Sequence, residues 1–89
     1  MSRQYKISKE FDRILLKLQK KDKQLYENLL KKMNEVLNIQ DVEHYKNLRN
    51  DLKEFKRVHV GHFVLLFKFD KTNNLIFFSD FDHHDKIYK

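Results

Sequence analysis

The chain has 89 residues, which predicts a single domain over residues 1–89 with a core near the lower size limit for independent folding. It has no cysteine, which excludes a disulfide framework and a cysteine zinc site, and no apolar run of membrane-spanning length, so we expect a soluble, cytoplasmic protein without a membrane partner. Its 19 lysine and arginine residues against 13 aspartate and glutamate residues give a formal charge of +6, which favours RNA, DNA or acidic proteins as partners about as strongly as it favours a solvated surface.

The first half of the chain predicts a short strand followed by two amphipathic helices. Gln4 to Ile7 forms the strand, and Ser8 is a suitable N-cap for the first helix. Asp22 lies in a polar break between two stretches of helical periodicity and can cap the second helix, which we expect to end near Asn38. The apolar stripes of these helices consist of Phe11, Ile14, Leu15, Leu18, Leu25, Leu29, Leu30, Met33, Val36 and Leu37. A short polar link between them predicts a helical hairpin that buries both stripes.

Residues 55–69 read FKRVHVGHFVLLFKF and predict a β-hairpin that reverses at Gly61, the only glycine of the chain. Before the glycine, alternating residue types indicate a strand with two unlike faces, one of them carrying Arg57 and His59. After it, residues 63–67 are apolar at every position, as in a central strand that is covered on both sides. Glycine adopts a positive φ at little cost, so a tight turn with His62 at its tip is expected here.

The remaining chain completes the predicted fold. Asp41 to Glu54 is polar and irregular, and residues 70–74 form a turn cluster before a third strand over Leu75 to Phe81. Within this strand, Leu75, Phe77 and Phe81 share one parity and hence one face. The order β-α-α-β-β-β predicts an α+β domain in which the N-terminal strand and the helical hairpin pack on an antiparallel sheet.

This fold predicts one charged, exposed sheet face. The helices must cover the other face to bury their stripes, so Arg57 and His59 would lie on the open one. The segment that follows the last strand would bring His83 and His84 beside them. Basic and titratable side chains would therefore meet on a rigid support.

The histidines indicate candidate acid–base chemistry. Four of the five lie between residues 59 and 84, and histidine titrates near neutrality. Metal-independent RNA cleavage needs a base for the 2′-OH, an acid for the leaving 5′-oxygen and cations for the charged phosphorane. His59, His84 and Arg57 would supply these functions, although surface histidines are more often solvated than catalytic.

The order of elements resembles that of the RelE superfamily of type II toxins, within the wider RelE/ParE group. The likeness runs from Leu48 through residues 55–61, FKRVHVG, to the closing HHDKIY at residues 83–88. It implies a ribosome-dependent mRNA endonuclease, an mRNA interferase that inhibits translation by 2′-OH attack on the adjacent phosphodiester without a metal or cofactor. The ribosome and mRNA would be its targets. A RelB- or DinJ-like antitoxin would neutralise it in a hetero-oligomeric complex.

Within this superfamily the site pattern is most similar to the YafQ branch. Many RelE members place an arginine that contacts the scissile phosphate where this chain has Val64. The histidine-rich YafQ site resembles residues 59–67 more closely, so the resemblance implies that His59 is an active-site histidine. His62 falls where that branch has an aspartate, and His84 matches its proposed acid. Tyr88 takes the place of a phenylalanine.

These observations lead to an assignment of roles. His84 and His59 would act as acid and base in either order, with His62 nearby. Arg57 and Lys56 would hold phosphate, and Tyr88 would stack on a base or position the phosphate. The residues expected to contact RNA are Lys56, His44, Arg49 and His83.

Two other functions fit the same residues. A non-catalytic, ParE-like toxin would share the fold and inhibit DNA gyrase, which the missing arginine at Val64 would suit. A metal-binding domain would use His59 and His62 together with His83 or His84 and a nearby carboxylate from Asp80, Asp82 or Asp85. The sequence leaves both alternatives open.

Overall fold

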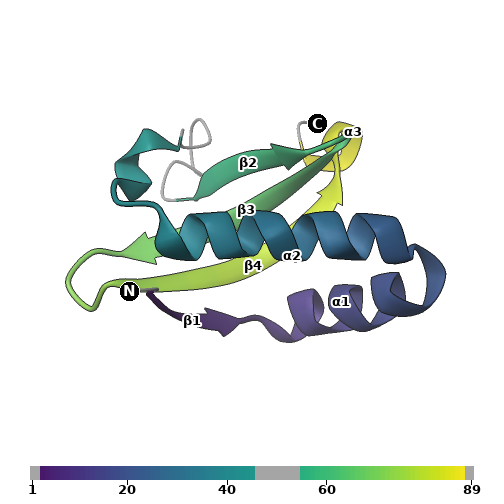
Figure 1. Ribbon diagram of the computed structural model, residues 1–89, viewed down its shortest axis with the longest axis horizontal. Coiled ribbons are helices and arrows are strands. Elements are labelled where there is room, and N and C mark those ends of the chain that lie inside the picture. The colour runs from purple at the N-terminus through teal and green to yellow at the C-terminus, as the bar shows by residue number, and fades with distance from the viewer. Residues whose placement is uncertain (1–2, 46–54, 88–89) are drawn as a thin grey trace.

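The computed structural model describes residues 3–45 and 55–87, in which helices pack on a four-stranded sheet (Figure 1). The elements in chain order are β1 (Gln4–Ile7), α1 (Lys9–Lys21), α2 (Lys23–Asn38), the 3-10 helix η1 (Val42–His44), β2 (Lys56–Val60), β3 (Phe63–Asp70), β4 (Leu75–His83) and α3 (His84–Ile87). The predicted α+β order is confirmed. The elements η1 and α3 are additions, because segments of three or four residues are too short to show a periodic pattern.

Both predicted helix caps are present. The Ser8 Oγ accepts a hydrogen bond from the Phe11 backbone N–H at 3.0 Å, and the Asp22 Oδ1 accepts one from the Leu25 N–H at 3.1 Å. Each cap satisfies a backbone donor that the first turn of a helix leaves without a partner. The Ser8 hydroxyl also donates to the Ser79 carbonyl at 2.8 Å, which ties the start of α1 to β4.

The sheet has the strand order β1-β4-β3-β2, and its last three strands form the predicted antiparallel meander. Strand β1 pairs in parallel with β4, with Gln4 opposite Leu75. The sheet, expected to be antiparallel, is therefore mixed. A strand of four residues carries no signal for the direction of its partner, so the sequence predicts β1 without predicting this pairing.

A register shift in β4 corrects the prediction for its faces. Leu66 lies opposite Asp80 but Phe67 lies opposite Phe78, so Ser79 is an extra residue of the kind found in a β-bulge. Its insertion reverses the alternation of side chains along the rest of the strand. Phe81 is consequently buried under the helices, on the face opposite to Leu75 and Phe77, and the prediction that these three residues share one face is wrong.

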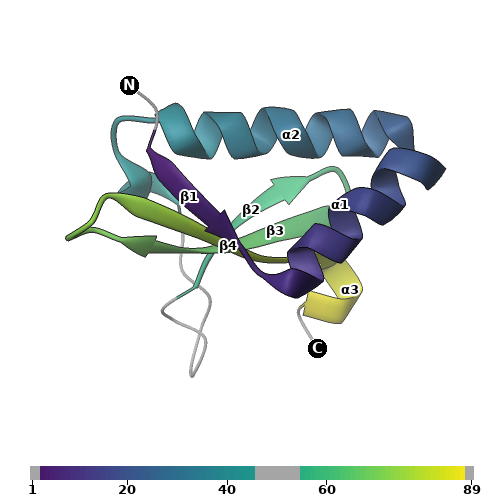
Figure 2. The ribbon, with the colours of Figure 1, turned by 90° about the horizontal axis from the view of Figure 1, so that it is seen from below.

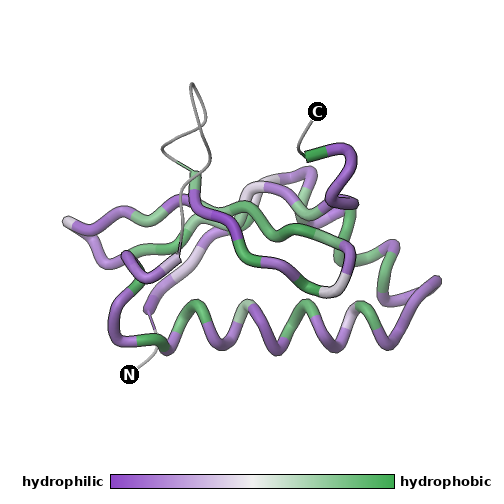
Figure 3. Tube along the Cα trace, turned by 90° about the horizontal axis from the view of Figure 1, so that it is seen from above, coloured by the Kyte–Doolittle hydropathy of each residue, from purple (hydrophilic) through white to green (hydrophobic). Residues whose placement is uncertain are grey.

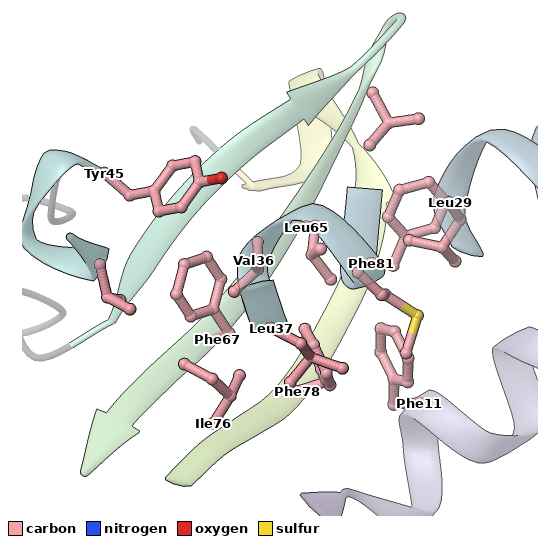
Figure 4. Packing of buried hydrophobic residues seen from close by; sticks show 13 residues of the cluster. Phe11, Leu29, Val36, Leu37, Tyr45, Leu65, Phe67, Ile76, Phe78 and Phe81 are labelled. Carbon is pink, nitrogen blue, oxygen red and sulfur yellow. The ribbon is translucent and has the colours of Figure 1, made fainter. Parts of the chain in front are cut away.

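The main core lies between the helices and one sheet face (Figure 4). Its fully buried side chains include Phe11, Leu29, Val36, Leu65, Phe67, Ile76 and Phe78. Burying a side chain of this size stabilises a fold by roughly 1.5–3 kcal/mol. Figure 3 shows apolar and polar residues alternating along α2. Its predicted apolar stripe is half-buried at Leu25, 39% exposed at Leu30 and buried at the other positions, Leu29, Met33, Val36 and Leu37.

A smaller apolar cluster lies on the other side of the sheet. Val64 and Leu66 of β3 are buried there, with Phe55 and Ile87 packed against them. Figure 2 shows α2 on one side of the sheet and α3 on the other. Strand β3 is thus covered on both sides, as its continuous apolar run predicts. Within residues 3–45 and 55–87, no helix is long and apolar enough to cross a membrane.

Candidate active site

The predicted turn between β2 and β3 is present at Gly61 and His62. Val60 and Phe63 pair on either side of it, and Gly61 has a φ of +62°. A Cβ atom added at Gly61 would meet nothing within 4 Å, so glycine is favoured here by its backbone conformation and not by crowding. The turn leaves the His62 side chain exposed at its tip.

Strand β4 and α3 bring two further histidines to this turn, which lies beside α3 in Figure 1. The His84 backbone N–H donates to the His62 carbonyl at 2.8 Å. The His59 and His84 rings stack with centroids 5.6 Å apart, and the His62 and His83 rings stack at 6.3 Å. Two adjacent pairs of imidazoles therefore meet where β2, β4 and α3 come together.

An acidic side chain accompanies both pairs. The Asp85 carboxylate lies 3.8 Å from the His84 Nδ1 and 3.7 Å from the His83 Nδ1. The Asp85 backbone N–H also donates to the His83 Nδ1, at 3.3 Å. From the sequence, Asp85 is expected only as a metal ligand, and its position next to two histidines in the chain is the signal for this contact.

The open sheet face is arranged in rows across three strands. One row runs from Arg57 of β2 through Leu66 of β3 to Asp80 of β4. The next row runs from His59 of β2 through Val64 of β3 to Asp82 of β4. Basic groups thus occupy the β2 side of this face and carboxylates the β4 side, with apolar residues between them. Burial raises the pKa of the Asp80 carboxyl, and the nearby Asp82 carboxylate adds to the rise.

Val64, where many RelE toxins would have an arginine, is fully buried. It packs with Leu66 in the small cluster to which Ile87 of α3 contributes. An apolar residue here provides part of the surface on which α3 docks. The chain therefore uses this position for packing next to the histidine pairs.

Lys56 lies on the other face of the sheet from Arg57 and His59. It is 5% exposed, and its ammonium group contacts the Glu43 carboxylate at 3.4 Å and the Tyr45 carbonyl at 3.3 Å. Lys56 thus connects β2 to η1, apart from the histidine pairs with which the sequence grouped it.

The remaining predicted contacts are elsewhere or lie outside the described residues. His44 is exposed in η1, with its ring 5.7 Å from that of Tyr45. Arg49 and Tyr88 are outside the described residues. Among residues 3–45 and 55–87, no three histidine, cysteine, aspartate or glutamate side chains are placed to hold a metal ion.

A shallow pocket of about 340 Å³ adjoins the histidine pairs between α2 and the end of β2. It is lined by Asn28, Lys31, Lys32, Glu35, His59, Val60 and Gly61. The sequence does not predict this pocket, because a pocket between two elements depends on how they pack and not on the pattern within either.

Comparison of the sequence with known proteins identifies a family. The family described as ParE toxin of the type II toxin–antitoxin system parDE matches residues 5–88. A protein of Methanocaldococcus jannaschii named as toxin RelE4 is 51% identical over 84 residues, which cover 93% of this chain and 87% of that protein. An uncharacterized protein of Methanosarcina mazei is 43% identical over 84 residues, covering 93% and 95% of the two chains.

Solved structures share the fold at low sequence identity. The RelBE2 toxin–antitoxin complex of Mycobacterium tuberculosis contains a chain with a TM-score of 0.76 and 18% identity, with 93% of this chain and 92% of that chain covered. YafQ of E. coli has a TM-score of 0.65 and 21% identity, with 98% and 99% covered. The family match over nearly the whole chain and the relative of 51% identity agree with these folds. This chain belongs to the RelE/ParE superfamily of type II toxins.

Proposed function

We propose that this toxin is a ribosome-dependent mRNA endonuclease that inhibits translation. The stacked pair of His59 and His84, with ring centroids 5.6 Å apart, is the observation that carries the proposal. Two imidazoles at this separation can reach a single phosphodiester. Arg57 follows the same face of β2 and supplies a cation close to them.

The proposed reaction uses these side chains as a base, an acid and a cation. One of the two histidines removes the proton of the 2′-OH, and the resulting oxygen attacks the adjacent phosphorus. The bond from phosphorus to the 5′-oxygen breaks, and the other histidine protonates that oxygen. The products are a 2′,3′-cyclic phosphate and a 5′-OH, and Arg57 stabilises the charge of the phosphorane between them.

Other predicted residues have supporting roles in this proposal. His62 and His83 form the second stacked pair and would add positive charge beside the reacting phosphate when protonated. Tyr88 would stack on a base, and Arg49 and His44 would contact the RNA further away, as the resemblance to RelE and YafQ implies. The ribosome would present the mRNA, which places the reaction in the cytoplasm.

We also propose an antitoxin partner of the RelB or DinJ kind. The structurally similar toxins include chains solved as a RelE–RelB complex from Pyrococcus horikoshii and as a DinJ–YafQ complex from E. coli. The formal charge of +6 favours association with an acidic segment of such a partner. The resulting complex would be a toxin–antitoxin hetero-oligomer.

Primer extension on mRNA from a translating extract tests the nuclease proposal. Wild-type protein should cleave mRNA only when ribosomes are present, and His59→Ala and His84→Ala should each lose at least a hundredfold in rate. Lys17→Ala, which changes an exposed residue of α1, serves as the control. Cleavage unchanged in both histidine variants would show that the assigned site is wrong.

Gyrase inhibition is the second candidate function. The family match to ParE toxins and the buried Val64 in place of an arginine favour it. A DNA supercoiling assay with purified gyrase separates the two candidates. Inhibition of supercoiling by folded protein that leaves mRNA intact would replace the nuclease proposal with this one.

A further inference from the structure

The pocket between α2 and β2 opens directly beside the proposed catalytic pair. His59 forms part of its wall and also stacks on His84. On the opposite wall, Asn28, Lys31, Lys32 and Glu35 follow one another at the spacing of one helix face. A strand of RNA with its reacting phosphate at His59 would therefore have its neighbouring nucleotide within reach of α2.

A network of hydrogen bonds fixes the α2 wall of this pocket. The Tyr45 hydroxyl donates to the Glu35 carboxylate at 2.5 Å, and the Lys32 ammonium donates to the same carboxylate at 3.1 Å. The hydrogen bond from Tyr45 lowers the pKa of Glu35, so the carboxylate is charged at neutral pH and holds Lys32 in place. Lys32 is thereby positioned in advance, at a smaller cost in side-chain entropy on binding.

Lys31 gives the pocket a net positive charge. It is exposed and takes part in none of the ion pairs formed among the described residues. Lys31 and Lys32 outweigh Glu35, so the lining attracts an anion even when His59 is neutral. A volume of about 340 Å³ is at the lower end of the range of roughly 300–1,000 Å³ for small-molecule sites.

The open sheet face provides a less favourable path for the same RNA. Asp80 and Asp82 lie on its β4 side, where their charge repels phosphate. Ile87 and Phe55 cover the apolar residues of β3 between them and the β2 side. The basic path from Arg57 and His59 therefore leads over the edge of the sheet toward α2.

We propose that this pocket binds the phosphate and ribose of the nucleotide next to the scissile bond, with Lys31 as the principal contact to the phosphate. The inference rests on the proposed nuclease function and extends its substrate site onto α2. It assigns a binding role to a helix that otherwise serves to cover the sheet.

Binding of a short RNA that cannot be cleaved tests this inference separately from catalysis. A 2′-O-methylated trinucleotide is titrated into the full-length protein, and amide chemical shifts are followed by NMR. We expect the amides of Asn28, Lys31 and Gly61 to shift. Lys31→Ala should weaken binding several-fold and reduce the slope of log affinity against log salt by about 0.7, the value for one phosphate of a single strand. Lys17→Ala, with the same change of net charge, should leave both quantities unchanged.

Three outcomes would overturn the inference. The first is that the trinucleotide shifts only amides elsewhere in the protein. The second is that Lys31→Ala and Lys17→Ala have equal effects on binding. The third is that a polyglutamate peptide shifts the pocket amides while the RNA does not. Loss of mRNA cleavage in the histidine variants together with any of these results would leave the nuclease proposal standing without the α2 site. Binding of the trinucleotide at α2 by a wild-type protein that does not cleave mRNA would overturn the nuclease proposal and leave only an RNA-binding site on α2.

Discussion

Lys56 and Arg57 are neighbours in β2 but lie in opposite environments. The Lys56 ammonium reaches the Glu43 carboxylate and the Tyr45 carbonyl under the helices, whereas Arg57 is on the open face with His59. Alternation in the sequence predicts that the two side chains point apart. It does not predict a buried lysine, because the groups that bind the ammonium come from η1 and from Tyr45, the residue that follows it.

This difference predicts that two substitutions in β2 have unequal effects on mRNA cleavage. Lys56→Met keeps most of the buried stem, and Glu43, whose side chain is 60% exposed, stays solvated, so cleavage should remain within a few-fold of wild type. Arg57→Ala should lower the single-turnover cleavage rate about a hundredfold, as expected when a donor to transition-state charge is removed. Equal losses in the two variants, both shown to be folded by circular dichroism, would contradict this division of roles.

The Asp80 carboxyl predicts a dependence of stability on pH. Burial raises its pKa in the folded state, so the folded state binds more protons than the unfolded state as pH rises above the ordinary aspartate range. The stability that the protonated Asp80 carboxyl contributes is therefore fully present below the pKa of this group in the unfolded state. It is lost as the pH rises through the pKa of the group in the folded state. The Asp80→Asn variant keeps an oxygen that can accept the Phe81 N–H.

We accordingly expect Asp80→Asn to increase the free energy of unfolding at pH 7 and to have little effect at pH 3. Urea unfolding at the two pH values measures the difference. The control is Glu27→Gln, which neutralises an exposed carboxylate of α2 beyond the first turn of that helix. A variant that is less stable than wild type at pH 7 would show that the Asp80 charge is favourable in the fold.

Ser8 joins α1 to the bulge of β4. Its Oγ accepts from the Phe11 N–H and its hydroxyl donates to the carbonyl of Ser79, the extra residue of β4. Ser8→Ala removes both interactions, and we expect a loss of about 1–2 kcal/mol in the free energy of unfolding. Chemical denaturation measures it, with Ser8→Thr, which keeps the hydroxyl, as the matched control. An equal loss in both variants would point to packing as the cause.

The sequence predicts those parts of the fold whose signals lie within one segment of the chain. The helices have their caps at Ser8 and Asp22, and the hairpin reverses at Gly61, because each signal is local. The bulge at Ser79 and the parallel pairing of β1 depend on the neighbouring strand, and no pattern within one segment reveals them. The face reversal in β4 follows from that bulge alone.

The sequence likewise predicts only part of the candidate site. Prediction of the hairpin and of β4 was sufficient to place His59 and His84 at one end of the sheet. The pocket on α2 was not predicted, because it depends on the distance between Lys31 and the edge strand. The burial of Lys56 was not predicted either, since η1 has no sequence pattern of its own.

The site depends on how α3 docks on the sheet. His84 begins α3, and Ile87 one turn later packs against the cluster of Val64 and Leu66. Four residues are too few for a helix that is stable alone, so this contact and the hydrogen bond from the His84 N–H to the His62 carbonyl hold His84 beside His59. The main core lies on the other face of the sheet and does not depend on α3.

Ile87→Ala should therefore separate activity from stability. We expect it to lower the free energy of unfolding by about 1–2 kcal/mol, less than a fully buried site, because Ile87 is only half-buried. Cleavage should fall by at least tenfold, because α3 would no longer be held against β3. Ile14→Ala, which truncates a half-buried residue packed on the main core, provides a control with a similar loss of stability and should keep its cleavage rate. Equal cleavage by the two variants at a temperature where both are folded would show that docking of α3 is not required for the arrangement of His84.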